Sequence, residues 1–330
     1  MPGMRLRDYI PALKYGAKLG LKELEGAGLL TFGSIFYVDS VTGSNTANDG
    51  KTPEQPRASI DSAVGLCTAN KGDHIICLPG HVETVTAAAG LDLDVAGITI
   101  VGLGSGDQRA TINFTTATTA DMDVDAADIS MDNILFTGGI DALVNPIDVN
   151  ADDFTLTNYE FRDVTGQVVD WVTLAGGIVR PHFYHMKGNL ATDLANNEDT
   201  PDSVFTLGVS AGTTGDVDDF QLVDFHVYGA QVKGLIDSVT KNTNILVKNG
   251  FYRTSASTGK FITSAATSQG IIGGSGDDEI VVQIAGTTIE INDIITNSGA
   301  QFVYVTGGIQ VVNLSGQRTV AYTGVTQSSS

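Results

Sequence analysis

Four segments of this 330-residue chain share one pattern of apolar residues, which is interrupted at a fixed place by Asn or Asp. Two apolar residues stand two positions apart, an Asn or Asp follows two positions later, and apolar residues then resume. The four segments are DISMDNILF from Asp128, DFTLTNYEF from Asp153, DFQLVDFHV from Asp219 and NILVKNGFY from Asn244. The last copy departs from the pattern because Gly250 directly follows its Asn.

The position of the Asn or Asp explains a change of phase within each segment. In a straight strand the inward-facing residues keep a period of two. Here the phase slips by one at the Asn or Asp, and a single residue in the left-handed region of backbone space would turn the chain and restore the inward positions beyond it. Asn and Asp are the non-glycine residues that best adopt this conformation. Each copy therefore predicts a strand, a one-residue corner and a second strand, with corners at Asn133, Asn158, Asp224 and Asn249.

The copies recur at the spacing of a coiled repeat. The first apolar positions, Ile129, Phe154, Phe220 and Ile245, are 25, 66 and 25 residues apart. Fainter copies are GITIVGL from Gly97, which places Gly102 at its corner, and GIVRPHF from Gly177, which places His182 there. A repeat of roughly 20–30 residues with short strands and a fixed corner is typical of a parallel β-helix, in which each coil buries its inner face against its neighbours. In the copy from Asp153 we expect Phe154, Leu156, Tyr159 and Phe161 to face inward.

The remaining segments predict three regions. Residues 1–33 form a basic amphipathic arm, residues 34–275 form the β-helix with a cap at its first end, and residues 276–330 form β-coils or hairpins. The cap combines a strand in SIFYVDS, a turn-rich loop, a short helix in RASIDSAVGLCTA and a strand in DHIICLPG. In the last region, strand-like runs are separated by short Gly-containing turns, which favours hairpins or final coils.

The N-terminal arm contrasts with the body in charge. Residues 1–25 carry five Lys or Arg against three Asp or Glu, a net +2, which leaves −22 for the rest of a chain of net charge −20. Apolar residues at helical spacing after Pro11 predict an amphipathic helix. The arm either packs on its own body or frays, docks onto a larger assembly, or lies on a membrane surface. The residues expected to dock are Arg5, Arg7, Tyr9, Ile10, Leu13, Lys14, Lys18 and Leu21.

Charge and hydropathy exclude several classes of function. A strongly acidic body repels nucleic-acid phosphates, so nucleic acid is not an expected partner. The sequence has no run of 18 apolar residues, so no membrane-spanning helix is expected. Its N-terminus lacks the continuous apolar segment of a signal peptide, which predicts that the protein is made in the cytoplasm and at first stays there.

Two longer stretches carry a resemblance to a known family. FYVDSVTGSNTANDGKTPEQPRASIDSAVG and GDHIICLPGHVETVTAAAGLDLDVAGITIVGLGSG resemble the opening of pectin-lyase-like right-handed parallel β-helix proteins, and more narrowly virion structural proteins of tailed bacteriophages. The similarity extends from about residue 36 to 249. It implies an all-β, single-stranded, right-handed β-helix in which the loop with Asp49, Gly50, Thr52 and Pro53 leads into the first coil. It also implies a tail spike, fibre or head-decoration protein, commonly trimeric, and some tail spikes cleave polysaccharide.

An enzyme of this fold would need carboxylates, either as a pair across a groove or as calcium ligands. ADMDVDAAD supplies Asp121, Asp123 and Asp125, which alternation places on one face. This set is either a solvated outer surface or a weak Ca²⁺ site, since close carboxylates repel each other unless a cation or water screens them. It lacks the Gly and the terminal Glu of an EF-hand loop.

The segment RPHFYHMKG is the local cluster with the most catalytic character. It holds Arg180, His182 and Tyr184, and Trp171 lies nearby. Trp171 and Tyr184 could stack on a sugar, and Arg180 and His182 could contact the same glycan or supply a base. The structural alternative is that His182 is a polar corner residue, and that Arg180 marks a local departure from the repeat.

Three hypotheses remain. The first is a structural virion protein, made in the host cytoplasm, whose arm docks the body onto the head or tail of the particle. It predicts a homotrimer, other virion proteins (capsid, tail or connector) as partners, no catalytic residues and no required cofactor. The alternatives are a polysaccharide-degrading tail spike and a non-enzymatic adhesin that binds a host surface glycan.

Overall fold

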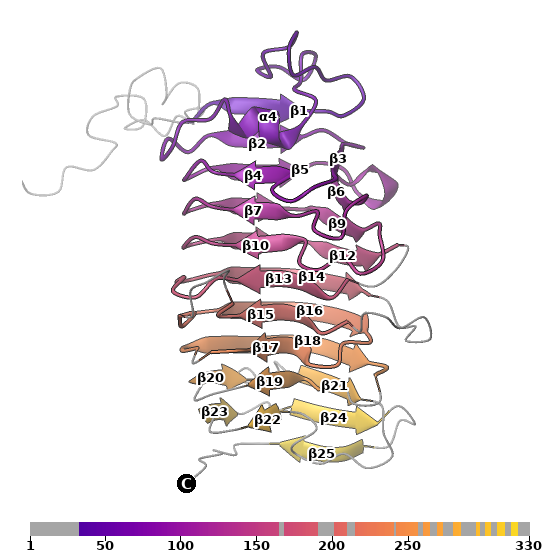
Figure 1. The fold of residues 1–330 in the computed structure, drawn as a ribbon. Coiled ribbons are helices and arrows are strands. Elements are labelled where there is room, and N and C mark those ends of the chain that lie inside the picture. The colour runs from indigo at the N-terminus through magenta and orange to yellow at the C-terminus, as the bar shows by residue number, and fades with distance from the viewer. Residues whose placement is uncertain are drawn as a thin grey trace, which may run out of the picture.

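The computed structural model describes residues 33–164, 168–190, 201–209, 215–240, 242–256 and 260–264, together with the backbone of later strands up to residue 322. The chain winds into a stack of coils whose strands pair in parallel with those of the neighbouring coils, along three faces (Figure 1). The coils follow one another along the stack, so that β1 (Ile35–Val38) and β25 (Arg318–Tyr322) lie at opposite ends.

Each face is a column of strands. Face 1 holds β1, β2 (His74–Cys77), β5 (Thr99–Gly102), β8 (Ser130–Asp132), β11 (Thr155–Thr157), the first halves of β14 (His182–Asn189), β16 (Gln221–Gly229) and β18 (Ile245–Thr254), then β20 (Gln269–Ile272) and β23 (Gln301–Tyr304). Face 2 holds β3 (Val82–Val85), β6 (Thr111–Phe114), β9 (Leu135–Gly138), β12 (Glu160–Asp163), the second halves of β14, β16 and β18, then β21 (Ile280–Ile284) and β24 (Ile309–Asn313). Face 3 holds β4 (Leu91–Leu93), β7 (Met122–Val124), β10 (Ile147–Val149), β13 (Asp170–Leu174), β15 (Ser203–Leu207), β17 (Gly234–Ser238), β19 (Ile262–Ser264) and β22 (Ile295–Asn297).

The faces follow in a fixed order around each coil. Faces 1 and 2 belong to one 17-stranded sheet, because β14, β16 and β18 turn the corner without a break, whereas face 3 is a separate 8-stranded sheet. At the last coil, β25 pairs antiparallel with β24. The prediction of an all-β parallel β-helix is therefore confirmed.

The predicted corners between faces 1 and 2 are confirmed. Asn133, Asn158, Asp224 and Asn249 all have a backbone φ between 51° and 59°. The corner amides also bond to the preceding coil. The side-chain Nδ2 of Asn133 donates to the carbonyl of Gly102 at 2.7 Å, and that of Asn158 donates to Asp132 Oδ1 at 2.7 Å. Asn249 makes the equivalent bond to Asp224.

A second left-handed position recurs between faces 3 and 1. Asp128, Asp153, Asp219 and Asn244, the first residues of the four copies, have φ between 53° and 60°. Each of these four coils therefore contains two left-handed residues, one before face 1 and one after it. This explains why an Asp or Asn stands both at the start and at the centre of every copy.

The predicted register of the segment around residue 180 is wrong. Thr155 pairs with His182, so Arg180 corresponds to Asp153 and the corner falls at His185, whose φ is 56°. His182 is thus an outward strand residue, and Arg180 is itself left-handed, with φ 59°. The corner expected at Gly102 is also wrong, because Gly102 ends β5 and the chain makes an excursion through the 3₁₀ turn η1 (Gly106–Gln108) before face 2 resumes.

The interior is one continuous apolar cluster from Phe36 to Ile262. The inward residues predicted for the copy from Asp153, namely Phe154, Leu156, Tyr159 and Phe161, are all at most 1% exposed. The short helix α4 (Ile60–Val64) covers the first end of the stack, and its Ser59 N-cap accepts a hydrogen bond from the Ser62 amide.

Several expectations fall on residues that the structure does not describe. The arm, with its docking residues Arg5, Arg7, Tyr9, Ile10, Leu13, Lys14, Lys18 and Leu21, lies outside the described residues, so its role stays a prediction. Among the described residues, no helix has the length and apolar character that crossing a membrane requires.

Candidate functional site

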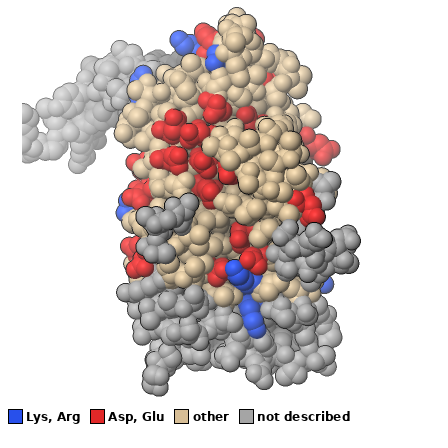
Figure 2. Space-filling model, viewed as in Figure 1, with Lys and Arg blue, Asp and Glu red and all other residues tan. Residues whose placement is uncertain are grey.

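An acidic ladder runs along the outer surface of face 3 in its first coils. Met122 and Val124 of β7 point inward and are fully buried, so Asp123 between them points out. In the neighbouring coils Asp92 and Asp148 occupy the same register position on β4 and β10. Figure 2 shows acidic side chains gathered on this part of the surface.

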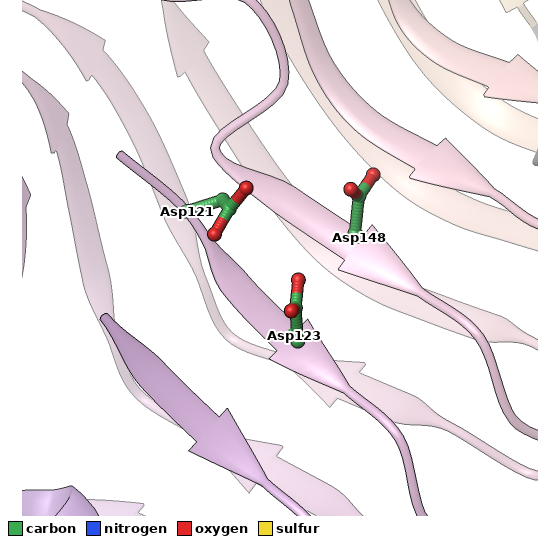
Figure 3. A group of neighbouring side chains, drawn as sticks. All are labelled: Asp121, Asp123 and Asp148. Atoms are coloured by element: carbon green, nitrogen blue, oxygen red, sulfur yellow. The ribbon is translucent and has the colours of Figure 1, made fainter. Parts of the chain in front are cut away.

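Three of these carboxylates converge. Asp121, at the entry to β7, brings its side chain beside Asp123 and Asp148, and one oxygen from each lies within 4.8 Å of the others (Figure 3). Asp121 accepts a hydrogen bond from the Ala89 amide, and Asn145 Nδ2 donates to Asp148 Oδ2 at 2.7 Å. These bonds fix the orientation of two carboxylates around the third.

Partial burial and mutual repulsion change how these groups ionise. Burial, followed by the charges of Asp121, Asp125, Asp148 and Asp92, raises the pKa of Asp123 to about 7. Burial also raises the pKa of Asp148 to about 6, against the opposing hydrogen bond from Asn145. At neutral pH this cluster therefore retains part of its protons, whereas an isolated surface aspartate would be fully ionised.

The cluster differs from the set that alternation predicts. Asp121 and Asp123 belong to it, but Asp125 is exposed directly after β7, where it accepts a hydrogen bond from Asn150 Nδ2 at 2.9 Å. Asp148 takes its place, and comes from the next coil. The three carboxylates Asp121, Asp123 and Asp148 have the oxygen chemistry that could hold a Ca²⁺ ion, and a weak Ca²⁺ site here stays a prediction.

The segment around Arg180 does not converge on one site. His182 and Tyr184 lie outward on face 1, where Tyr184 donates to Gln221 Oε1 at 3.0 Å. Arg180 sits in the turn before this face and forms an ion pair with Asp153, its counterpart in the preceding coil, with an Nη2–Oδ2 distance of 2.7 Å. His185 stands at the corner, 3.2 Å from Asp224. The cluster that looked catalytic in sequence is spread along one coil and tied into its neighbours.

Trp171 cannot serve as a sugar-stacking residue. It is fully buried in the core, where its ring stacks on Phe161 with centroids 4.7 Å apart and planes 8° from parallel. Strict alternation from the buried Val172 and Leu174 would have placed this ring outside, but β13 departs from it, and Trp171 and Val172 are both buried. Tyr184 remains partly accessible on face 1.

A groove that the sequence did not reveal runs along the corner between faces 1 and 2. It has a volume of about 810 Å³, and the excursion around η1 forms one wall. Arg109 from this excursion reaches down to the Asn158 carbonyl and to Glu160, with an Nη1–Oε2 distance of 3.4 Å. Arg162 binds the other oxygen of Glu160 at 2.6 Å. A smaller groove of about 340 Å³ shares His185 and Lys187 with the first, so the hollow continues along the corner.

The architecture is a parallel β-helix with the pectin-lyase-like fold. A solved structure named rhamnogalacturonan lyase matches it with a TM-score of 0.53, covering 88% of this chain and 85% of that chain at 13% sequence identity. At this level of identity the likeness shows the fold alone. No protein-family model matches the chain, and no curated protein sequence matches it.

Proposed function

We propose that this protein is a structural component of a tailed-bacteriophage particle, in which the β-helix is a stiff body held by the N-terminal arm. The proposal rests on the contacts that the repeated polar residues make. Asn133, Asn158 and Asn249, the corner amides, bond to the preceding coil, and Arg180 is paired with Asp153. Side chains engaged in joining coils rigidify the stack rather than form a catalytic centre.

The assignment to a bacteriophage particle comes from the sequence resemblance. A β-helix leaves open ends, and α4 lies at the first of these, together with β1, the first strand after the expected arm. We infer that the arm attaches this end to the head or tail, that the bodies associate as a homotrimer, and that the virion is where the protein resides.

Particle association can be measured directly. Tailed particles purified from cells that express the gene should contain the protein, by mass spectrometry and by gold labelling of a defined region. Removing residues 1–32 should abolish incorporation while leaving the thermal melting of the body unchanged. Absence from purified particles, together with a monomer at high concentration in analytical ultracentrifugation, would refute the proposal.

Polysaccharide cleavage is a second candidate, because one specific arrangement favours it. The corner groove brings Arg109 and Arg162 to either side of Glu160, and burial lowers the pKa of the Arg109 guanidinium. The structural neighbour is named for lyase activity on a polysaccharide. Such an enzyme would release reducing ends or unsaturated sugars from a polysaccharide panel. The Glu160→Gln variant should lose that activity and the exposed control Glu54→Gln should keep it. No turnover on any polymer would remove the candidate.

A further inference from the structure

Outward positions of face 2 bring three aromatic rings together in the later coils. In β16 and β18 the inward residues Val227 and Tyr252 are fully buried, so their neighbours point out. The strand register aligns Lys187, His226 and Phe251 in one row, and Asn189, Tyr228 and Arg253 in the next. We call Lys187, His226, Tyr228, Phe251 and Arg253 the aromatic platform.

The three rings of the platform touch one another. The centroid of His226 lies 4.9 Å from those of both Tyr228 and Phe251, and the centroids of Tyr228 and Phe251 are 5.3 Å apart. None of the three rings is fully buried, and His226 is exposed. Aromatic area that stays in contact with solvent is a feature of binding surfaces.

The cations of the platform differ from four others on the body. Arg109, Arg162, Arg180 and Lys233 are each held by a carboxylate. Within the described part of the chain, no ion pair joins Lys187 or Arg253 to a carboxylate, although the protein carries 38 Asp and Glu against 18 Lys and Arg.

Arg253 and Lys187 flank the rings. The guanidinium carbon of Arg253 lies 5.9 Å from the centre of the Tyr228 ring, which orients it beside the aromatic surface. Lys187 is exposed at the other side of His226, in the coil before it. The platform is therefore an apolar, π-rich centre with two cations at its margins.

We propose that the aromatic platform binds an acidic saccharide. Aromatic side chains offer a flat apolar surface to the C–H face of a pyranose ring, and the guanidinium of Arg253 and the ammonium of Lys187 pair with a carboxylate or sulfate on the sugar. The proposal goes beyond a role in a particle, and it requires neither cleavage nor the corner groove.

Charge and size favour this occupant. Nucleic acid shares the anionic groups, but its long phosphate chain would be repelled by the −22 outside the arm. A stable protein–protein interface buries roughly 1,200–2,000 Å², far more than five side chains supply. A short acidic saccharide needs only a small surface, on which Lys187 and Arg253 can pair with its anionic groups.

The test uses three hexasaccharides of equal length and isothermal titration calorimetry on the full-length protein. The probes are a neutral maltohexaose, a carboxylated alginate hexauronate and a sulfated heparin fragment. At least one acidic probe should bind, and bind about tenfold or more tighter than the neutral one, which corresponds to one ion-paired contact. Preference between the two acidic probes distinguishes a uronate from a sulfated source. Equal binding of all three probes, or no binding of either acidic probe, overturns the proposal.

A matched pair of double variants then locates the site. Lys187→Gln with Arg253→Gln should weaken the acidic probe about tenfold or more, because it removes both cations while leaving the inward residues in place. Lys51→Gln with Lys71→Gln removes the same charge from exposed positions near the first end of the stack, and should leave affinity within about twofold. Equal losses in both variants would show nonspecific attraction and overturn the site. A platform variant that dissociates oligomers and leaves saccharide binding intact would assign the surface to a second copy instead.

Discussion

The outer surfaces of faces 2 and 3 share one arrangement, in which equivalent positions of neighbouring coils stack, but they stack different residues. In both, neighbouring strands place equivalent positions about 4.8 Å apart along the stack. On face 3 this arrangement stacks Asp92, Asp123 and Asp148, whose charges repel. On face 2 it stacks His226 and Phe251, whose rings attract.

The inward positions of the two faces are alike, so the two faces differ in their outward residues. Met122 and Val124 on face 3 and Val227 and Tyr252 on face 2 are all fully buried and apolar. The core constrains every second residue, and the alternate residues are free to build an acidic surface on one face and a cationic, aromatic one on another. Stability therefore depends mainly on the inward ladders, and the proposed saccharide site lies on an outward one.

The largest expected effect distinguishes an inward residue from its outward neighbour. Phe161→Ala should lower the free energy of unfolding by about 3–5 kcal/mol, because it removes the ring that stacks on Trp171 and leaves a cavity. Arg162→Ala, one residue further along β12, should change it by less than about 1 kcal/mol, because that side chain is exposed. Chemical denaturation measures both, and similar losses would break the division between inward and outward roles.

The second-largest effect on stability is expected at the corners. Asn158→Val should destabilise the protein by about 1–3 kcal/mol, because a β-branched residue resists a φ of 53° and the bond to Asp132 is lost. Asn158→Gly keeps the backbone conformation accessible and should cost less than the Val variant. Thermal melting of the two variants separates backbone strain from the lost amide bond. If Val and wild type melt together, the left-handed corner is not required.

A smaller effect should follow from relieving the repulsion on face 3. The pKa of Asp123 rises from 3.8 to about 7 on folding, so the folded state holds its proton more tightly than the unfolded state. Stability from this group is present below about pH 4 and is lost as the pH rises through 7.

Asp123→Asn removes the ionisable group, so the variant should gain melting temperature at pH 8, by about 2–4 °C for each 1 kcal/mol relieved. It should show no such gain at pH 4. Asp107→Asn, on the exposed excursion between faces 1 and 2, serves as the control and should behave as wild type. A variant that melts lower than wild type at pH 8 would mean that the cluster is held by a favourable contact rather than strained by repulsion.

The smallest expected effect concerns the single Trp of the chain. Because Trp171 is fully buried, its fluorescence emission should be blue-shifted and poorly quenched by acrylamide in the folded protein. Saccharides that bind the aromatic platform should leave that emission unchanged. Strong quenching by acrylamide would show that Trp171 is accessible to solvent, and Trp171 would again be a candidate for sugar stacking.

The sequence predicted the coils where the corner residue was Asn or Asp and failed where it was not. Asn133 and Asn158 marked their corners because few other residues tolerate a left-handed backbone. His185 occupies the same place in the next coil, held against Asp224, and without an Asn to anchor it the alignment shifted by three residues. The length of the loops between faces, which varies from coil to coil, sets this register and has no local signature.

The candidate sites depended on contacts between coils, which sequence alone did not supply. Asp148 joins Asp121 and Asp123 through the pairing of β10 with β7, a register that alternation within one strand cannot give. Tyr228 and Phe251 could have been found, because counting alternate positions beyond the corners at Asp224 and Asn249 places both outside. Trp171 was misplaced because its strand lies on face 3, where the repeated pattern does not extend.

The most direct test of the division between the two faces is one calorimetric comparison with the acidic hexasaccharide that binds wild type best. Lys187→Gln with Arg253→Gln alters face 2, and Asp121→Asn with Asp123→Asn alters face 3. The face 2 variant should lose about tenfold or more in affinity, while the face 3 variant should bind as well as wild type or slightly tighter, because two repelling charges are gone. Loss of binding in the face 3 variant with none in the face 2 variant would contradict the account.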